Sequence, residues 1–500
     1  MNKKSITILV VCLIVSVMSV SLAFFSAGII GNGKNVSVNA KELTINFDNN
    51  NEIASGIIEP GWSSTNTFSV ENKSKTTFTY DIVLKNYKNT TKTNGYLVYK
   101  ITSTNGYNMT EYKDMPKDGE NTYDLVIARG ITIEPGSSNK QSYSLEIKYL
   151  DSTEDQSIDM GSTVTGSLYI VESTTNENNP YTKGTLGYQI MEDNSNIKTR
   201  TDFSTTYTDV NIGTMYKAKE ENTDVYYFAG DARNNWVKFG GYYWRIIRTN
   251  SDGSVRLLYH GTSTTATNAY IGTSKFNNSY NNIAYVSYMY GSLGSIPNAR
   301  TNQTNPSTIK TTIDNWYTRN LEAKGYTKYL STTAVYCNDR TYTVSGSNTL
   351  FGAYTRLRTN KTPSYDCSAI EDKFTVDTST GNGKLTYPIA LMTADEIAYA
   401  GGKKATGLSS PYAWYYLNSA GGSITGSTFW WLMSPNRMEG PKSLVYDVGG
   451  SGDPGYLGND FVDGGGAVRP VLSLKSCTQY NTGNGSSSNP YTIQETTSGC

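Results

Sequence analysis

Apolar and polar residues alternate through much of the first third of the chain. The segments "TFTYDIVLKN" and "SYSLEIKYL" place an apolar side chain at about every second position, which is typical of strands with one buried face. Turn-rich pieces such as "EPGWSS" and "EPGSSN" separate these segments from similar ones, namely "KELTINF", "NTFSVEN", "YLVYKIT" and "GSLYIVES". Several short strands at this spacing predict a β-sandwich over residues 28–173.

A polar segment follows the predicted sandwich. Residues 174–184 are rich in turn-forming residues and are predicted to be a linker. The tetrapeptide "NPYT" at Asn179–Thr182 returns at Asn489–Thr492, so the two copies bracket the rest of the chain. This arrangement predicts one large domain over residues 185–476 and a tail over residues 477–500.

The large domain mixes strand and helix patterns. "YYWRIIR" and "SVRLLY" predict a hairpin around the Asp252–Gly253 turn. The segment "NPSTIKTTIDNWYTRNL" predicts a helix whose apolar face contains Ile309, Ile313, Trp316 and Leu321. A shorter helix is predicted in "TADEIAYAGG", with Thr393 and Glu396 as a capping box and Gly401 as the stop. The expected fold class is therefore mainly β, with an α+β C-terminal domain.

The segment "FWWLMSP" predicts a strand that is covered on both faces. Phe429, Trp431 and Met433 would point to one face, and Trp430 and Leu432 to the other. Apolar residues on both faces indicate a buried strand. The alternative is an exposed aromatic platform for a ligand.

The first 27 residues are predicted to be a signal peptide or an N-terminal membrane anchor. Lys3 and Lys4 precede an uncharged run from Ser5 to Phe25, which is long enough to cross the roughly 30 Å hydrocarbon core at about 1.5 Å per residue. The positive flank keeps the N-terminus in the cytoplasm and directs the rest of the chain outside. Small residues in "SLA" permit cleavage after Ala23, and export with cleavage is preferred over anchoring. The expected location is extracellular, at the cell surface or membrane-anchored with the C-terminus outside.

Cysteine usage agrees with an oxidising compartment. Cys12 lies in the apolar run, and the other four cysteines, Cys337, Cys367, Cys477 and Cys500, are an even number. Three pairings are open, and sequence proximity favours Cys337 with Cys367 and Cys477 with Cys500. No C-x-x-C motif is present to support zinc binding or thioredoxin-like chemistry.

The order of motifs in the large domain resembles that of a known family. The series "WRII", "IDNWY", "LMTADE", "YAGG", "FWWLMSP" and "VRPVLSL" resembles a bacterial surface-domain family of unknown function. That family is related to the Fibrobacter-type paralogous domain and, more distantly, to formylglycine-generating-enzyme-like C-type lectin folds. The resemblance covers nearly all of residues 190–476. It implies a C-type-lectin-like domain in which the tryptophan strand and the "VRP" strand are neighbours and the Gly-rich connection between them faces the ligand. By its strand pattern and export segment, the block 28–173 resembles the sandwich of camelysin and TasA-type secreted matrix proteins.

The charge balance and the absence of catalytic motifs argue against several classes of function. Lys plus Arg equals Asp plus Glu, at 43 each, so no basic field favours nucleic acid. A Ser-His-Asp triad would have to use the single histidine, His260, and no G-x-S-x-G elbow accompanies it. Asp395 and Glu396 are better explained by helix capping than as a glycosidase pair. The chain is therefore predicted not to be an enzyme.

The connection from Tyr446 to Gly466 is the predicted recognition segment. Its glycines predict an irregular, exposed and mobile loop between two buried strands. Tyrosine offers large contact area at low entropic cost, and the predicted ligand-binding residues are Tyr446, Tyr456, Asp460 and Phe461. Calcium is the one candidate cofactor, although none is required; its predicted oxygen ligands are Asp447, Asp453, Asn459, Asp460 and Asp463. The alternative is that these residues only form turns.

These observations predict an exported bacterial cell-surface protein. A sandwich stalk would present a C-type-lectin-like domain that binds an extracellular glycan or protein ligand. Contact with a membrane would be made only through the N-terminal segment, and no nucleic acid would be bound. The alternatives are a glycan-acting hydrolase and a self-assembling extracellular matrix subunit.

Overall fold

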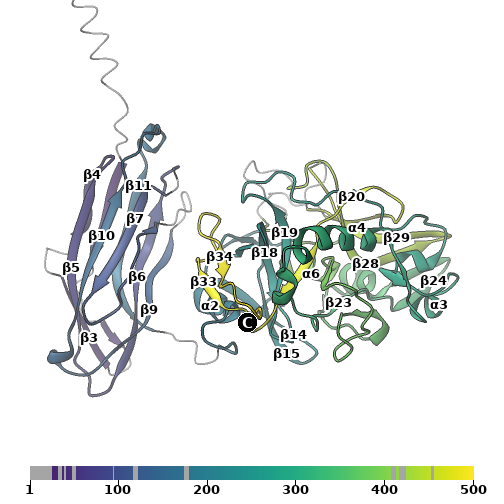
Figure 1. The fold of residues 1–500 in the computed structure, drawn as a ribbon, viewed down its shortest axis with the longest axis horizontal. Helices are drawn as coiled ribbons and strands as arrows, with labels where there is room; N and C mark the ends of the chain where they lie inside the picture. The colour runs from purple at the N-terminus through teal and green to yellow at the C-terminus, as the bar shows by residue number, and fades with distance from the viewer. Residues whose placement is uncertain are drawn as a thin grey trace, which may run out of the picture. The chain divides into compact units, whose positions relative to one another are not determined.

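The structure, a computed structural model, divides the chain into two units. It describes residues 25–31, 36–38, 41–47, 52–93, 95–115, 122–173, 179–406, 413–415, 424–451 and 455–500. The first unit spans residues 1–177 and the second residues 178–500. Both are built mainly of strands, as predicted (Figure 1).

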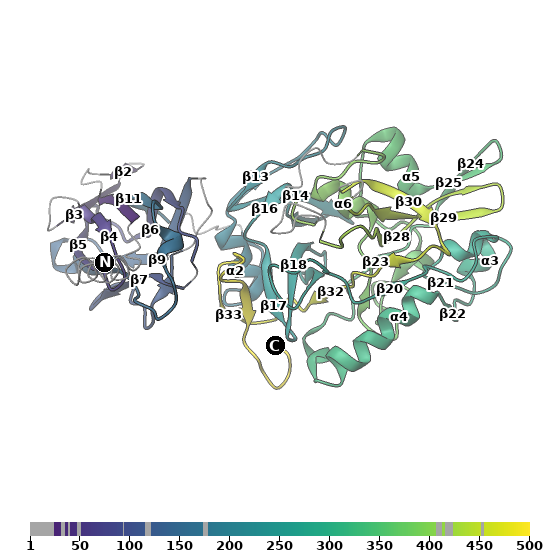
Figure 2. The same ribbon diagram turned by 90° about the horizontal axis from the view of Figure 1, so that it is seen from above.

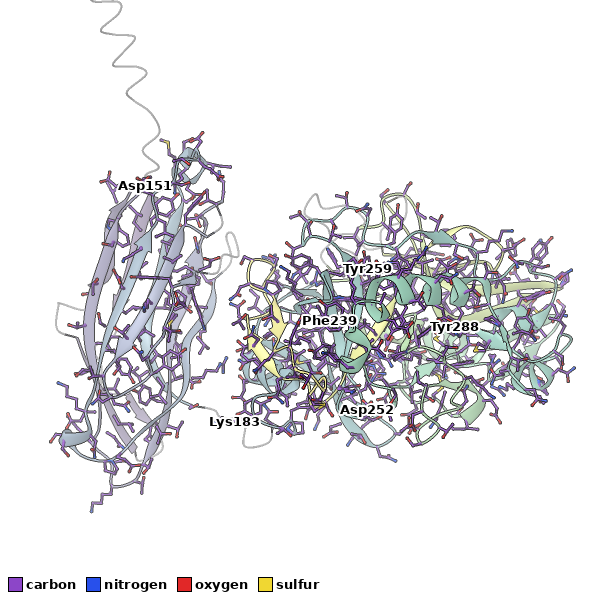
Figure 3. All side chains as sticks on the ribbon, in the orientation of Figure 1. Asp151, Lys183, Phe239, Asp252, Tyr259 and Tyr288 are labelled. Carbon is purple, nitrogen blue, oxygen red and sulfur yellow. A yellow bond between two sulfur atoms is a disulfide. The ribbon has the colours of Figure 1, made fainter. Side chains whose placement is uncertain are left out.

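Two sheets make up the first unit. One sheet contains, in spatial order, β4 (Glu52–Ile58), β1 (Phe25–Gly31), β11 (Thr163–Glu172), β6 (Phe78–Asn89) and β9 (Tyr123–Ile133). The other contains β2 (Val36–Val38), β3 (Lys41–Phe47), β5 (Ser63–Asn72), β10 (Gln141–Tyr149), β7 (Leu97–Ser103) and β8 (Lys113–Asp114). Side chains of both sheets form one core (Figure 3), and the hydroxyl groups of Tyr80 and Tyr143 meet there at 2.6 Å. The alternating segments are therefore strands of a sandwich, to which β1, β2, β4, β8 and β9 are added.

The second unit contains a ten-stranded sheet (Figure 2). Its main path contains β12 (Asn196–Lys198), β14 (Thr214–Glu220), β15 (Thr223–Tyr227), β18 (Tyr242–Thr249), β17 (Trp236–Phe239), β34 (Tyr491–Ile493) and β33 (Tyr480–Thr482). β19 (Val255–Gly261) pairs with β18 and with β32 (Val471–Leu474), which also pairs with β27 (Ile389–Ala390). The predicted hairpin is confirmed: β18 and β19 flank the Asp252–Gly253 turn, where Gly253 has a φ of 77°.

A seven-stranded sheet contains the tryptophan strand. It comprises β20 (Thr273–Ser274), β31 (Gly466–Ala467), β28 (Trp430–Glu439), β25 (Asn348–Phe351), β24 (Tyr342–Ser345), β29 (Lys442–Val448) and β30 (Leu457–Phe461). Trp430 and Trp431 are both fully buried, so the predicted burial is confirmed. β31, which directly precedes the "VRPVLSL" segment, lies beside β28 through the pairing of Trp430 with Ala467. β32 lies in the other sheet, so the tryptophan strand and the "VRP" strand, which the resemblance implies are neighbours, lie side by side at Ala467 and diverge beyond it.

Short helices lie against these sheets. They include α2 (Leu186–Asp193), α3 (Ile296–Arg300), α4 (Thr308–Tyr317), α5 (Gly352–Tyr354) and α6 (Ala394–Ala400). α4 buries Ile309, Ile313 and Trp316 as predicted, and the chain continues as a π-helical turn over residues 318–322. In α6 the capping box is confirmed, because Thr393 Oγ1 accepts the N–H of Glu396 and Glu396 Oε2 accepts that of Thr393.

The two ends of the second unit meet. β34 pairs in parallel with β17, and Thr185 forms a β-bridge with Gln479. Residues 477–500 are therefore part of the ten-stranded sheet, where the sequence pattern had suggested a separate tail. The predicted linker also ends in contacts with the unit, since Asn179 Nδ2 donates to Glu192 Oε1 of α2 at 2.9 Å. Disulfides join Cys337 to Cys367 and Cys477 to Cys500, which is the pairing favoured by proximity.

Most of the predicted export segment lies outside the described residues. This applies to residues 1–24, and with them to Cys12 and the cleavage position after Ala23. Phe25 is the first residue of β1. In the part of the chain that the structure describes, no helix combines the length and apolar character that a bilayer crossing requires.

Candidate functional site

The predicted recognition segment contains a pair of strands. β29 and β30 are antiparallel, with Tyr446 opposite Asn459 and Asp447 opposite Gly458. The prediction of an irregular loop is therefore wrong for residues 446–448 and 457–461, and most described residues of the segment are buried or half-buried, where exposure was expected. Every residue from Ser443 to Val448 is buried, so β29 is covered on both faces and continues past the point where the glycines suggested a loop.

Burial divides the predicted binding residues into two groups. Tyr446 is fully buried and its hydroxyl has no partner among the described residues, so its predicted role as an exposed contact residue is wrong. Asp447 is also buried, with 6% of its surface exposed. Five predicted residues are half-buried: Tyr456, Asn459, Asp460, Phe461 and Asp463.

Two cationic side chains converge on Asn459. Its Oδ1 accepts a hydrogen bond from Lys404 Nζ at 2.9 Å and another from Arg437 Nη1 at 2.8 Å. Lys404 follows α6 and forms a parallel bridge with Leu457, which places it along the outer edge of β30. Neither cation is distinguished by any sequence motif, because residues far apart in the chain make these contacts. We refer to this group as the β30 site; it comprises Lys404, Arg437, Asp447, Tyr456, Asn459, Asp460 and Phe461.

The charged groups of the β30 site have shifted pKa values. Burial, with a smaller contribution from the charge of Asp460, raises the pKa of Asp447 to about 8, while Lys404 opposes the shift. Burial lowers the pKa of Lys404 to about 8; Asp447 opposes this shift, and Arg437 contributes to it. Asp447 therefore keeps its proton at neutral pH and can donate a hydrogen bond as well as accept one.

Aromatic rings and charges form the rim of the site. The Phe461 ring lies 5.7 Å from that of Tyr280, and Lys442 Nζ lies 5.1 Å from the Phe461 ring centroid. Lys404 Nζ lies 5.9 Å from the Tyr456 ring centroid. Half-exposed rings beside amide, ammonium and guanidinium groups can contact a ligand that has both apolar and hydroxyl surfaces.

The predicted calcium ligands do not form a coordination shell in the described residues. No group of three or more His, Cys, Asp or Glu side chains there could hold a metal ion. Asn459 Oδ1 already accepts from two cations, and Asp460 Oδ1 accepts from the N–H of Phe461. Asp463 is half-buried, and Asp453 lies outside the described residues, so calcium binding stays a prediction.

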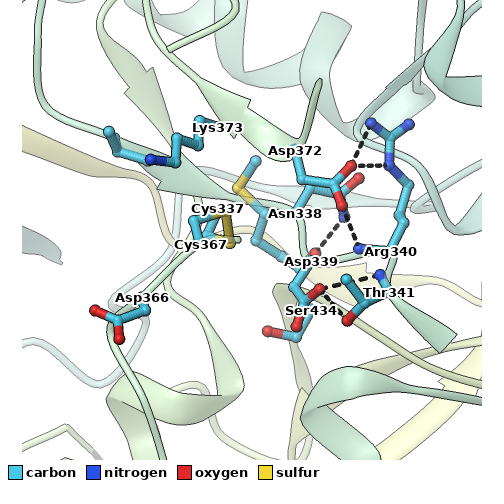
Figure 4. Close-up of a disulfide and its surroundings, with 12 residues drawn as sticks. Cys337, Asn338, Asp339, Arg340, Thr341, Asp366, Cys367, Asp372, Lys373 and Ser434 are labelled. Carbon is cyan, nitrogen blue, oxygen red and sulfur yellow. Dashed lines mark hydrogen bonds and ion pairs between the residues drawn. A yellow bond between two sulfur atoms is a disulfide. The ribbon is translucent and has the colours of Figure 1, made fainter. Parts of the chain in front are cut away.

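A second candidate is a charged cavity beside the Cys337–Cys367 disulfide. Its volume of about 20 Å³ suffices for a water molecule. The charged residues that line it are Glu220, Arg248, Arg256, Asp339, Arg356, Asp366, Asp395 and Glu396. Figure 4 shows the disulfide next to Asn338 and Asp339, with Asp372 bound to Arg340.

Most of the charged side chains that line this cavity are held in ion pairs. Glu396 Oε1 accepts from Arg256 Nη1 at 2.8 Å and from Arg248 Nε at 3.0 Å. Burial opposes the ionisation of Glu396, but the two arginines outweigh it and lower its pKa. Asp395 pairs with Arg356 Nη2 at 2.9 Å, so it has an ion-pair role beyond the expected helix capping. Because these carboxylates are held in ion pairs, they are better explained as a network that stabilises the fold than as acid–base groups.

Comparisons with known proteins do not assign a family. No family model matches the chain, and no curated protein matches it. One similar solved structure is described as "AvmM Catalyzes Macrocyclization in Alchivemycin A Biosynthesis"; it is 8% identical, covers 28% of this chain and 95% of its own, and has a TM-score of 0.15. A non-cellulosomal cohesin from the hyperthermophilic archaeon Archaeoglobus fulgidus is 12% identical and covers 32% of this chain and 96% of its own, with a TM-score of 0.11. At these TM-scores neither structure bears on the fold or the function.

Proposed function

We propose that the chain is an exported bacterial surface protein whose second unit binds an extracellular glycan at the β30 site. The observation that supports this most is the convergence of Lys404 and Arg437 on the half-buried Asn459, beside the partly exposed rings of Tyr456 and Phe461. Sugars present hydroxyl groups to such polar atoms and C–H faces to aromatic rings. The first unit would serve as a stalk.

Two further observations are compatible with this proposal. Both disulfides fit an oxidising, extracellular environment. The motif order of the second unit resembles that of bacterial surface domains with C-type-lectin-like folds. Calcium is not needed for the proposed contacts, because Lys404 and Arg437 supply the positive charge of the site.

A glycan array with the full chain tests the proposal. We expect the wild type to retain at least one glycan class, and Asn459→Ala to weaken that binding at least about tenfold, since the centre of the polar contacts is lost. Tyr342→Ala is the matched control, because Tyr342 is an exposed aromatic residue on β24 of the same sheet. Retention of no glycan, or equal binding by Asn459→Ala, would contradict the proposal.

A glycan-acting hydrolase is the second candidate. It is favoured by one observation: Asp447, whose pKa is raised to about 8 by burial, remains protonated near Asp460, as a general acid must. Incubation of the full chain with cell-wall and host glycans, followed by measurement of new reducing ends, separates the two functions. If the wild type generates new reducing ends and Asp447→Asn does not, the hydrolase is supported. If the wild type binds a glycan and generates no new reducing ends, the lectin-like function is supported.

A further inference from the structure

Two buried arginines of the second unit have no carboxylate partner among the described residues. Arg245 is 3% exposed and Arg469 is fully buried. Arg245 donates to Asn235 Oδ1 and to the carbonyl of Ala232, and Arg469 donates to the carbonyls of Tyr259, Ala269 and Tyr415 (Tyr259 is labelled in Figure 3). Within the described ranges, no carboxylate oxygen lies within 4.0 Å of either guanidinium group.

The other buried arginines of this unit differ in this respect. Arg248 pairs with Glu220 at 2.7 Å, Arg256 with Glu396 at 2.8 Å, and Arg340 with Asp372 at 2.7 Å. The longer-range partner of Arg245 is Asp231, which is itself paired with Arg233 at 2.8 Å. In the part of the chain that the structure describes, Arg245 and Arg469 are therefore the buried arginines without a carboxylate within 4.0 Å.

The neighbouring sequence cannot supply the missing charge. Arg469 donates to Tyr415, and Arg245 lies 6.0 Å from the Trp414 ring centroid. The segments on either side, residues 407–412 and 416–423, read "GLSSPY" and "YLNSAGGS" and contain no acidic residue. No carboxylate of the adjoining chain is therefore available to neutralise these two charges.

Polar atoms without partners lie in the same cluster. Neither ring nitrogen of His260 forms a hydrogen bond of good geometry among the described residues, although the Thr264 backbone lies close enough to oppose the lowering of the His260 pKa. Trp430 Nε1 also has no partner there. The His260 ring lies 4.3 Å from the ring of Trp236, on which Arg245 stacks at 4.1 Å. Arg469 lies 4.7 Å from the Trp430 ring centroid. We call this group the buried cation cluster; it comprises Trp236, Arg245, His260, Trp414, Trp430 and Arg469.

The members of the cluster affect one another electrostatically. Burial lowers the pKa of Arg245 to about 9, although Asp231 opposes the shift. Burial and the charge of Arg245 lower the pKa of Arg469, and burial and both arginines lower that of His260 well below its usual value. His260 is therefore neutral, whereas a guanidinium group keeps its proton in proteins. Two buried positive charges without a counterion are costly.

We propose that the buried cation cluster binds a halide ion such as chloride. A single negative charge would offset much of the repulsion between Arg245 and Arg469. Among the described residues of the cluster, the donors without a partner are Trp430 Nε1 and one nitrogen of His260, and aromatic rings lie beside the cluster. This suits a compact monovalent anion better than phosphate or sulfate, which need more donors and more space.

Thermal unfolding of the full chain tests this proposal. Chloride is exchanged for gluconate at constant sodium concentration and ionic strength, so that only the anion changes. We expect the melting temperature to rise saturably with chloride, by about 2–4 °C at saturation, and bromide to act in the same way. Equal melting temperatures at all chloride fractions would overturn the proposal.

Two conservative variants test whether the chloride-dependent rise in melting temperature arises at the buried cation cluster. Neither variant removes an arginine. Trp430→Phe deletes the unpartnered Nε1, and Trp431→Phe is the matched control because Trp431 Nε1 donates to the carbonyl of Ser274 at 2.9 Å. Trp430→Phe should need several-fold more chloride for half of the rise, and Trp431→Phe should need the same amount as the wild type. An equal chloride response in both variants would overturn the assignment to this cluster.

Saturable quenching by iodide provides a measurement that does not depend on stability. A bound iodide should quench tryptophan fluorescence of the wild type with a saturating component, and chloride should compete with it. A quenching curve that stays linear with iodide and does not respond to chloride would contradict a halide site beside Trp236, Trp414 and Trp430.

Discussion

Gly458 lies directly opposite Asp447 across β29 and β30, and a Cβ atom on Gly458 would lie 2.6 Å from Asp447 Oδ1. That approach is closer than van der Waals contact allows, and the ring of Tyr456 closes the other side at 2.8 Å. Gly458 is therefore part of the packing around the buried carboxyl group.

The first prediction concerns this close approach. Gly458→Ala should lower the free energy of unfolding by about 1–3 kcal/mol, because the added methyl group displaces Asp447 or Tyr456. Gly465→Ala is the matched control, since a Cβ atom there meets nothing within 4 Å. Denaturant unfolding of both variants measures the difference. A Gly458→Ala variant as stable as the control would contradict the prediction. It would mean that Asp447 and Tyr456 can move away from the added methyl group without a loss of stability.

The second prediction concerns pH. Burial raises the pKa of Asp447 to about 8 in the folded chain, whereas an unfolded aspartate titrates near 3.9. The folded state thus binds the proton more tightly, and this group's contribution to the free energy of unfolding falls by about 1.4 kcal/mol per pH unit between about pH 4 and pH 8. Asp447→Asn should therefore gain stability relative to the wild type as the pH rises. Parallel pH–stability curves for the two proteins would contradict this.

The third prediction concerns the ion-pair network at α6. Glu396→Gln keeps the shape of the side chain but leaves the buried Arg256 without a negative partner, which should cost about 3–5 kcal/mol. Glu439→Gln removes a half-exposed charge that pairs with Arg437, and should cost less than about 1 kcal/mol. Chemical denaturation compares the two variants. Similar losses in both would show that burial does not govern the cost of removing these carboxylates.

The fourth prediction concerns the tryptophan strand. Trp431→Ala should lower the free energy of unfolding by about 3–5 kcal/mol, because Trp431 is fully buried against Phe276 and Phe429. Tyr342→Ala, at an exposed position of the same sheet, should change it by less than about 0.5 kcal/mol. If Trp431→Ala unfolds at the wild-type denaturant concentration, the strand is not a core element.

Local patterns predicted the elements whose signals are contained within a few residues. The alternation in Phe78–Asn89, the capping box at Thr393 and the two-sided burial of Trp430 and Trp431 depend on near neighbours, and the structure has all of them. The β30 site could not be predicted in this way. It depends on the bridge between Lys404 and Leu457, which are far apart in the chain, and no short motif specifies that contact.

Glycine content was a misleading signal for the recognition segment. Glycine lowers strand propensity on average, but Gly458 is placed where no side chain fits and the neighbouring apolar residues keep the strand regular. Tyr446 was expected at the surface because tyrosine is common in binding loops, yet its ring lies in the core. The amino-acid composition of this segment does not show which of its residues are buried. Burial of the β29 residues follows from the pairing of β29 with β28.

The pairing of β34 with β17 has a consequence for biosynthesis. The central hairpin of the second unit acquires this neighbour only from Tyr491–Ile493, within the last ten residues of the chain. Synthesis must therefore pass Ile493, more than 250 residues after β17, before this sheet can be completed. Until then the edge of β17 is open to other extended chains, which is a state that chaperones protect. The second unit thus matures only after β34 has been synthesised, whereas the first can already be folded.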